Sequence, residues 1–340
     1  MWTVRNTTGY AGAGTFLRDA EGHEHWCVGV RATFHVDPGG TVRMADRQIP
    51  VTMVPRYGGH DNDVLLADDD IIPCAPTTDI LLRGWAQPDA PADAPVALSA
   101  SVGALSKRAV LHPPRRARLI RGRWRVEPTG GDGAASLGWE ASFGGLLPDA
   151  GVAEPPDNPL GTGLWLRAPR LFEDGAETDL PRIEGAGMDC ARDPQASRSV
   201  GFGPVPRWWR SRIALAGTFD AAWRRERSPA MPVDHDPGFL MSAPRDQWPD
   251  KPLVGGEPVR LEGFTPGMDW RFRLPQALFQ AETQFGPSVV PLPMRLARID
   301  LWPSDGRLSM LWLGTLACDG QDQRIGATRL SLRQLSGVTS

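Results

Sequence analysis

The segment MRLARIDLWPSDGRLSMLWLG, residues 294–314, indicates the fold most clearly. Apolar and polar residues alternate along both of its arms, which is the period-2 pattern of strands that bury one face. The arms flank Pro303-Ser304-Asp305-Gly306. These residue types favour a tight turn, because Pro fixes φ and Gly accepts a positive φ. The segment therefore predicts a β-hairpin.

The N-terminal region shows the same kind of pattern. Residues 14–40, GTFLRDAEGHEHWCVGVRATFHVDPGG, predict two strands around a turn at 19–22, and one face of the second strand carries Trp26, Val28, Val30, Ala32 and Phe34. Four more segments, each bounded by Gly or Pro, predict further strands. They are TTDILLRGWAQP (77–88), PVALSASVG (95–103), ARLIRGRWRVEP (117–128) and SLGWEASFGG (136–145).

The composition limits the helix content. The chain has 340 residues, of which 38 are Gly and 33 are Pro, and both residue types disfavour helix interiors. The best helix candidate is residues 219–227, where Asp220 can serve as N-cap and Pro229 stops the helix. We therefore expect a mainly β protein with antiparallel sandwich-like or barrel-like sheets, long ordered loops rich in Gly, Pro and Trp, and one or two short helices.

We expect one domain over residues 1–316, with a division into two β lobes, about 1–145 and 160–316, as the alternative. The dividing segment GGLLPDAGVAEPPDNPLGTG, residues 144–163, reads as an ordered loop because it lacks the Ser/Gly or charged composition of a linker. Residues 317–340 read as a polar C-terminal segment. The sequence contains neither an internal repeat nor a low-complexity tract.

Charge and cysteine content argue against several classes of protein. The net charge is −3 and the pI is near 6.1, whereas nucleic-acid binders usually carry a basic domain. No apolar run approaches the roughly 20 residues of a membrane helix, and the N-terminus lacks signal-peptide features. The four cysteines are far apart. We therefore expect a cytoplasmic protein with reduced thiols that contacts neither nucleic acid nor membrane.

Three clusters contain residue types that could carry chemistry. His23-Glu24-His25 offers two of the three or four ligands that a zinc site needs. Residues 58–63, GGHDND, followed by Asp68-Asp69-Asp70, lack the ligand spacing of a calcium loop. Asp234-His235-Asp236 has no nucleophile on a G-x-S-x-G turn and reads as turn chemistry. No phosphate-binding glycine motif is present either. We therefore predict no catalytic residue, no cofactor and no metal site.

The stretch GFGPVPRWWRSRIALAGTFDAAWRRERSPAMPVDHDPGF, residues 201–239, combines Trp with many Arg. Exposed Trp and Arg are common anchors of protein interfaces, and Arg also pairs with carboxylates. The alternative is that these Trp residues belong to the core of a fold rich in loops. The candidate partner-binding residues are Arg207, Trp208, Trp209, Arg210, Arg212, Trp223 and His235.

An ordered set of motifs resembles the domain of unknown function 2169 family, found in bacterial type VI secretion loci. The motifs are MWTVRNTTGY (1–10), DAEGHEHWCVGVRATF (19–34), PTTDILLRGWA (76–86), GWEASFGG (138–145), NPLGTG (158–163), the segment from 201 to 248, LVGGEPVRLEGFTP (253–266) and RIDLWPSDGRLSMLW (298–312). Residues 105–126 match the family pattern only loosely, and the pentapeptide repeats of some relatives are absent.

The resemblance implies a non-enzymatic adaptor or chaperone. Such a protein binds a secreted toxin effector in the cytoplasm and loads it onto the VgrG/PAAR spike before firing. Two alternatives remain open. A Trp-rich carbohydrate-binding protein or glycoside hydrolase would need, for hydrolysis, two carboxylates roughly 5–9.5 Å apart. A structural accessory subunit of the secretion apparatus would differ in its stoichiometry in the fired machine.

Overall fold

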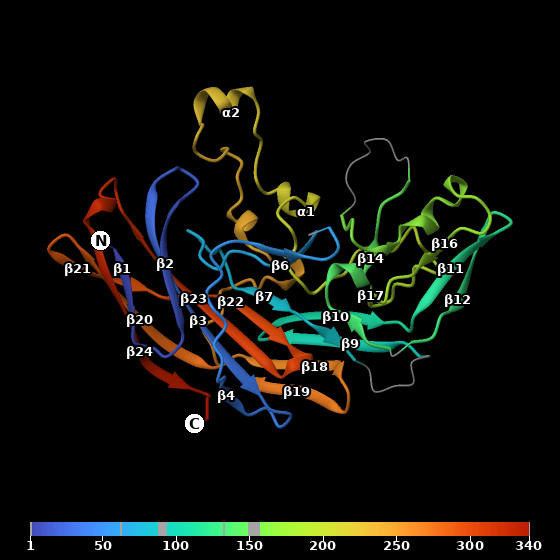
Figure 1. Cartoon of the computed structure of the whole chain (residues 1–340), viewed down its shortest axis with the longest axis horizontal. Helices are drawn as coiled ribbons and strands as arrows, with labels where there is room; N and C mark the ends of the chain where they lie inside the picture. The colour runs from blue at the N-terminus through green and yellow to red at the C-terminus, as the bar shows by residue number, and fades with distance from the viewer. Residues whose placement is uncertain (1, 62, 88–93, 132, 149–156, 340) are drawn as a thin grey trace.

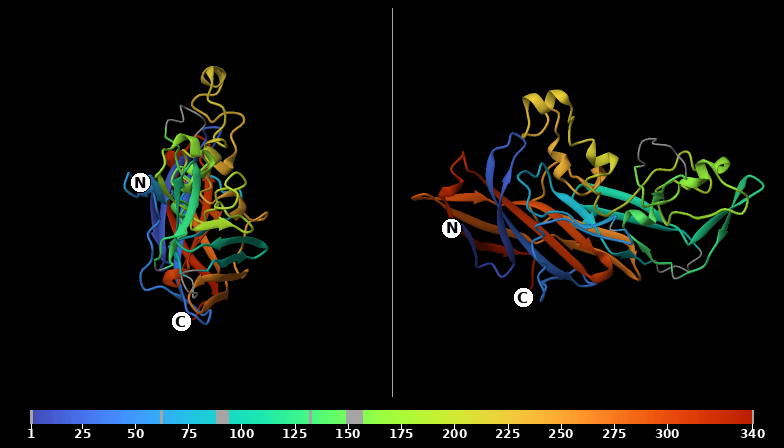
Figure 2. Two further views of the ribbon diagram at one scale, coloured as in Figure 1. Left: turned by 90° about the vertical axis from the view of Figure 1, so that its right-hand side faces the viewer. Right: turned by 45° about the horizontal axis from the view of Figure 1, so that its top comes forward.

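The computed structural model describes residues 2–61, 63–87, 94–131, 133–148 and 157–339. The protein is mainly β, as the sequence predicts, and its sheets lie along the long axis of the molecule (Figure 1). A helical segment around α2 projects away from the sheets at one side, and both views of Figure 2 show this projection. The N-terminus lies beside β1 at one end of the molecule.

The central sheet is built mostly from antiparallel neighbours. Its strand order is β2-β3-β23-β22-β7, with β4 added to one part of β3. The strands are β2 (Ala11–Arg18), β3 (Glu24–Val36), β23 (Arg307–Ala317), β22 (Arg295–Trp302), β7 (Asp79–Leu82) and β4 (Val42–Met44). The predicted hairpins of residues 14–40 and 294–314 are confirmed, as β2-β3 and β22-β23. The turn of the second contains the short 3-10 helix η6 (Pro303–Asp305).

Alternation along these strands fills one face of the central sheet with apolar side chains. Val30 pairs with Trp312 and Ala32 with Met310 across β3 and β23, and all four are buried. They belong to one hydrophobic cluster that runs from Tyr10 to Leu330. Burying a large apolar side chain of this kind contributes about 1.5–3 kcal/mol, so this face is the main source of hydrophobic stabilisation.

Two further sheets cover that face. The terminal sheet has the order β1-β24-β20-β21, from β1 (Thr3–Asn6), β24 (Ile325–Ser336), β20 (Gln276–Phe285) and β21 (Ser288–Pro293). The lower sheet has the order β17-β10-β9-β18-β19, from β17 (Ile183–Gly185), β10 (Leu105–Leu111), β9 (Val96–Val102), β18 (Pro258–Thr265) and β19 (Met268–Arg273). Both sheets contribute buried side chains to the same cluster.

The opposite end of the molecule carries a smaller, distal sheet. Its order is β12-β11-β16, from β12 (Arg123–Pro128), β11 (Arg115–Ile120) and β16 (Glu177–Asp179). Short pairs lie between the larger sheets: β5 (Arg56–Gly58) with β6 (Val64–Ala67), β8 (Trp85–Ala86) with β13 (Ala135–Ser136), and β14 (Phe143–Gly144) with β15 (Thr162–Gly163).

Residues 136–145 differ from the predicted strand. They form the 3-10 helix η1 (Trp139–Ala141), and only their ends pair with other strands. Gly144 and Gly145 take φ values of 156° and 108°, and such positive φ values interrupt an extended ladder. The ordered loop expected over 144–163 includes residues 149–156, which lie outside the described residues.

The C-terminal segment also differs from the expectation of a polar tail. Residues 325–336 form β24, which lies between β1 and β20. Ile325 and Leu330 enter the main hydrophobic cluster. Its alternation of polar and apolar residues is therefore that of a strand with one buried face.

The helices are short. In the described part of the chain α1 spans Arg210–Ile213 and α2 spans Ala221–Glu226. The predicted helix at 219–227 is confirmed as α2, and its N-cap is Asp220, whose Oδ1 accepts the backbone N–H of Trp223 at 2.7 Å. None of the helices within the described ranges has the length and apolar character needed to cross a membrane.

Candidate functional site

The segment that projects from the sheets is the arm, residues 206–241, and it contains both α-helices and the 3-10 helix η4 (Pro237–Leu240) (Figure 1). The arm leaves and returns at one place, because the backbone N–H of Val205 donates to the carbonyl of Ser242 at 2.7 Å. Farther out, the N–H of Asp236 donates to the carbonyl of Leu215 at 2.9 Å. The two legs of the arm are therefore joined along their length.

Arg212 fixes the base of the arm. Its Nη1 donates to the Val205 carbonyl at 2.7 Å and its Nε donates to the Phe239 carbonyl at 2.8 Å, so one guanidinium links both legs. Its Nη2 lies 2.6 Å from Asp68 Oδ2. Asp68 directly follows β6, so Arg212 ties the arm to the body of the protein.

Arg212 belongs to a larger buried cluster of charges on that polar face, here called the ionic layer. Arg31 Nη1 lies 2.7 Å from Asp70 Oδ2, and its Nη2 lies 2.8 Å from Asp300 Oδ2. Arg298 Nη1 lies 2.9 Å from Asp70 Oδ1. The layer consists of Arg31, Arg83, Arg207, Arg212 and Arg298 with Asp68, Asp69, Asp70, Asp79 and Asp300.

The layer contains five arginines and five aspartates, and the arginines lower the pKa of two of the carboxylates. Burial alone would raise the pKa of Asp68, but the guanidinium groups of Arg212 and Arg207 hold that pKa below its ordinary value. Burial likewise opposes ionisation of Asp300, and Arg83 and Arg31 more than offset it, so its pKa is also lowered. The ionic layer is therefore a set of mutually dependent ion pairs beneath the arm.

Some of the predicted partner-binding residues are buried at the base of the arm, and others are exposed to solvent. Trp209 is 1% exposed and packs edge-on against Trp139, with the ring centroids 5.3 Å apart. Trp208 is 47% exposed. Arg207 contacts Asp68 and Asp69 at 2.9 Å each, and Arg210 is exposed at the start of α1.

The other two predicted residues lie farther out on the arm. Trp223 is partly buried on α2, and its indole N–H donates to the carbonyl of Ala230 at 2.9 Å. His235 is partly buried, with Nδ1 3.3 Å from the carbonyl oxygen of Ala216. Sequence proximity thus brings Arg207, Trp209 and Arg212 together at the base but leaves Trp223 and His235 apart from them.

Asp234 and Asp236 have the turn roles that the sequence predicts. Asp234 accepts hydrogen bonds from the backbone N–H and hydroxyl of Thr218, at 2.9 and 2.7 Å. Asp236 caps η4 by accepting the N–H of Gly238 at 2.7 Å. Both carboxylates shape the arm by bonding to its own residues.

The outer part of the arm presents apolar side chains to solvent. Phe219 is 50% exposed and Val233 is 85% exposed. Phe219 packs edge-on against Trp223, with the ring centroids 4.7 Å apart. Trp223 and Val233 also line a shallow hollow of about 410 Å³ between α2 and residues 232–234. Ile213, on α1, is 51% exposed.

The other two clusters from the sequence analysis, residues 23–25 and 58–70, form ion pairs within the protein. Asp19 Oδ2 lies 2.8 Å from His25 Nε2 and 3.4 Å from His23 Nδ1. Asp68 and Asp70 pair with arginines, as described above. Among the described residues, no group of three or more His, Cys, Asp or Glu side chains could hold a metal ion.

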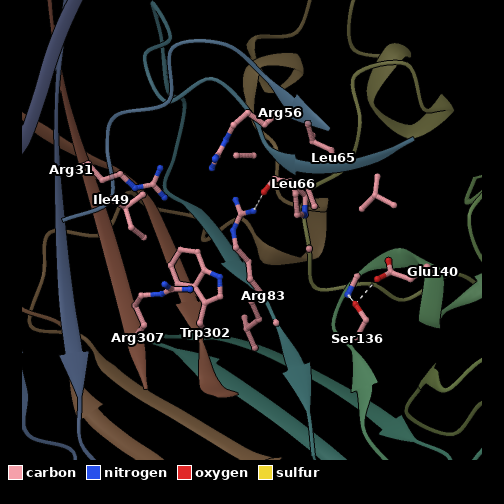
Figure 3. Close-up of a pocket in the computed structure, with 17 residues that line it drawn as sticks. Arg31, Ile49, Arg56, Leu65, Leu66, Arg83, Ser136, Glu140, Trp302 and Arg307 are labelled. Carbon is pink, nitrogen blue, oxygen red and sulfur yellow. Dashed lines mark hydrogen bonds between the residues drawn. The ribbon is translucent and has the colours of Figure 1, made fainter. Parts of the chain in front are cut away.

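A pocket of about 420 Å³ opens at the foot of the arm (Figure 3). Its wall is contributed by separate segments: β5-β6, the end of β7, the β22-β23 turn, β13 with η1, and Gly203-Pro204, which lead into the arm. Charged and aromatic side chains in this wall include Arg56, Arg83, Glu140, Trp302 and Arg307. The pocket lies beside the ionic layer, because Arg31 and Arg83 belong to both.

The Trp302 ring is flanked by two guanidinium groups. Arg307 Cζ lies 4.5 Å and Arg83 Cζ lies 5.7 Å from its centroid, which are cation–π distances. Arg83 Nε also lies 2.6 Å from Asp300 Oδ1, and Arg307 Nη2 lies 2.7 Å from Asp305 Oδ2. The Arg56 guanidinium has no ion-pair partner among the described residues, and it points into the pocket (Figure 3).

Residues 21–313 match the family described as "Uncharacterized protein conserved in bacteria (DUF2169)". The chain belongs to this family. Comparison with curated proteins and with solved structures gives no match. The family match begins in the β2-β3 turn and ends within β23, so it includes the arm, the ionic layer and the residues that line the pocket.

The ionic layer and the pocket were not predicted from the sequence. A signal was present, since Arg31 is the one charged residue of VGVRATF, and Arg298 and Asp300 are the two charged residues of the otherwise apolar LARIDLW. A charge at such a position must find a buried partner. Its partner cannot be identified from the sequence, because Arg31 and Asp300 are 269 positions apart.

Proposed function

We propose that this protein is a non-enzymatic adaptor of a bacterial type VI secretion system. It binds a toxin effector in the cytoplasm and loads it onto the VgrG/PAAR spike. The observation that carries the proposal is the arm, a projecting segment that is firmly held at its base and presents apolar side chains to solvent. The secretion context comes from the family resemblance, which the match over residues 21–313 supports at the level of the family.

The exposed side chains of the arm suit protein recognition. Trp208 and Ile213 near its base, and Phe219 and Val233 farther out, are each about half exposed or more. Buried tryptophan is among the side chains that contribute most to binding energy at interfaces, and the apolar groups around it add area that a partner removes from water. A standard interface buries about 1,200–2,000 Å² in total, so the effector would cover the arm together with part of the adjoining body.

The rigid base supports the same interpretation. Arg212 links both legs of the arm to Asp68, so little conformational entropy is lost when a partner binds. Preorganisation of this kind increases affinity without adding contacts.

Co-purification tests the proposal directly. The tagged full-length protein is expressed with the effector encoded beside it, and the retained effector is measured for the wild type, Phe219→Ser and Val233→Asp. Both arm variants should lose most of the retained effector, because a polar or charged group replaces an apolar contact. Val289→Asp is the matched control, since Val289 is 59% exposed on β21, outside the arm, and this variant should retain the effector.

Secretion provides the second measurement. In a deletion strain the effector should become unstable or fail to leave the cell, and the wild-type gene but not the Val233→Asp variant should restore export. If the effector stays soluble and is exported normally without this protein, the adaptor function is wrong. Recovery of the protein at fixed stoichiometry in the fired apparatus would instead identify a structural subunit.

A further inference from the structure

We propose that the pocket at the foot of the arm binds a single carboxylate of a peptide segment, with Arg56 as its main cation and Arg83 and Arg307 as additional donors. This inference rests on the proposed protein-binding function, because it takes the ligand to be part of a protein partner. It adds a chemical specificity that the exposed apolar residues of the arm do not supply.

Some guanidinium N–H groups in the wall of the pocket have no acceptor in the described part of the chain. Arg83 uses Nε for Asp300 and Nη1 for the carbonyl of Leu66, which leaves its third nitrogen. Arg307 uses Nη2 for Asp305, while its Nε is buried without an acceptor among the described residues. A buried donor that lacks an acceptor is costly, so such groups usually mark a site for water or a ligand.

Arg56 distinguishes this pocket from the neighbouring ionic layer. The layer's arginines each face a carboxylate, whereas the guanidinium of Arg56 pairs with no carboxylate in the described part of the chain. It enters the pocket from β5, opposite Trp302 (Figure 3). An unpaired arginine beside two partly paired ones attracts an anion, and its planar fork matches the two oxygens of a carboxylate.

The charges around the pocket disfavour a doubly charged anion. Arg83 and Arg307 are already partly neutralised by Asp300 and Asp305. Only Arg56 brings an uncompensated positive charge, and Glu140 adds a negative one across the pocket. Arg56 and Glu140 together carry no net charge, so a carboxylate is held by direct pairing with Arg56. A phosphate dianion would meet about twice the repulsion from Glu140 that a carboxylate meets.

The remaining wall fits a peptide better than a free anion. Leu65, Leu66 and Ile49 provide an apolar surface beside the arginines. Glu140, held by a hydrogen bond from Ser136, offers a carboxylate acceptor for a backbone N–H. The volume of about 420 Å³ lies within the usual range of ligand pockets. The expected ligand is therefore an acidic residue, or the terminal carboxylate of a polypeptide, beside an apolar residue.

The test uses the purified full-length protein and three synthetic peptides followed by saturation-transfer NMR titration. Acetyl-Leu-Glu-Leu-amide carries a side-chain carboxylate, and acetyl-Leu-Gln-Leu with a free C-terminus carries a terminal one. Acetyl-Leu-Gln-Leu-amide carries neither. At least one carboxylate peptide should bind about tenfold more tightly than the neutral peptide, because it gains a charge-assisted hydrogen bond. Which of the two binds more tightly identifies the source of the carboxylate.

Arg56→Gln should abolish this preference. Because the Arg56 side chain is exposed, we expect the variant to fold like the wild type. Arg125→Gln, an exposed arginine of β12 on the distal sheet, is the matched control and should keep the preference. Equal binding of the three peptides, or equal behaviour of the two variants, overturns the inference. Binding of inorganic phosphate through Arg56 without binding of either carboxylate peptide also overturns it.

The outcomes separate this inference from the adaptor function. Val233→Asp lies outside the pocket lining and should leave peptide binding unchanged. If the carboxylate preference holds while the effector fails to co-purify with the wild type, the adaptor function fails and the pocket remains a carboxylate site. If the effector co-purifies but the peptides show no preference, the pocket inference fails and the arm remains the binding site.

Discussion

Arg212 Nη2 lies 2.6 Å from Asp68 Oδ2, and this ion pair joins the projecting arm to the body of the protein. Both side chains are almost fully buried, at 3% and 1% exposure. A pair in this environment gains Coulomb energy but has lost its hydration, so its net contribution to stability is small while both partners are present. Its significance is that neither partner can be removed alone.

We expect Asp68→Asn to lower the free energy of unfolding by about 3–5 kcal/mol, because Arg212 would stay buried without its counterion. Urea unfolding measures this change. Asp37→Asn is the control, since the Asp37–Arg43 pair is partly exposed and should contribute less than about 1 kcal/mol. If the two variants unfold at the same urea concentration, Asp68 does not support the arm.

The two adjacent tryptophans should differ in how much each contributes to the free energy of unfolding. Trp209→Ala should lower the free energy of unfolding by about 3–5 kcal/mol, because a buried indole leaves a large cavity. Trp208→Ala should lower it by less than about 1 kcal/mol, as expected for an exposed position. Urea unfolding of both variants checks the contrast. Equal losses would show that the exposure of Trp208 does not reflect its environment in solution.

Much of the sheet structure could be predicted because its signals are local. Alternation in residues 14–40 and 294–314 and the turn at 303–306 predict β2-β3 and β22-β23, and Asp220 predicts the start of α2. Each depends on neighbours within a few positions. The prediction fails at 136–145, where η1 replaces the middle of the expected strand and where Asn158, distant in the sequence, donates to the carbonyls of Trp139 and Phe143.

The arm and the pocket could not be predicted, because both depend on contacts between residues that are far apart in the sequence. Trp208 and Trp209 were both candidate partner-binding residues, but Trp208 is exposed whereas Trp209 is buried against Trp139, which is 70 positions away in the sequence. The pocket combines Arg56, Glu140 and Trp302, which pairing between distant strands brings together. Such sites depend on long-range register, which local patterns do not encode.

Acid should destabilise the protein through His112. Burial and the nearby Arg115 guanidinium lower the pKa of His112 to about 4, and Glu184 Oε1 lies 3.7 Å from its Nε2. The fold therefore favours the neutral imidazole. This contribution is complete above the unfolded-state pKa of about 6.5 and is lost as the pH falls from there towards 4, with a total of about 3 kcal/mol.

Urea unfolding of the wild type and His112→Gln at pH values from 7 to 4 measures this effect. The wild-type advantage should shrink by about 3 kcal/mol over that range, since Gln does not titrate. Titratable groups that do not contact residue 112 titrate in both proteins and cancel in the difference. Parallel stability curves would mean that His112 is not held neutral by the fold.

The bulge in β18 gives a test of the lower sheet. Gly263 has a φ of +81°, and a Cβ placed there would lie 2.2 Å from the carbonyl oxygen of Ala97 in β9. The register between β18 and β19 shifts between Leu261 and Thr265, which includes this residue. Gly263→Ala must therefore distort two paired backbones as well as adopt a strained φ.

We expect Gly263→Ala to lower the free energy of unfolding by at least about 3 kcal/mol, from strain and overpacking combined. Gly122→Ala is the matched control, because Gly122 has a similar φ of +74° but nothing within 4 Å of its added Cβ. That variant should lose only the conformational cost, about 1–2 kcal/mol. Urea unfolding compares the two. Equal losses would show that β9 and β18 can separate at the bulge without further cost.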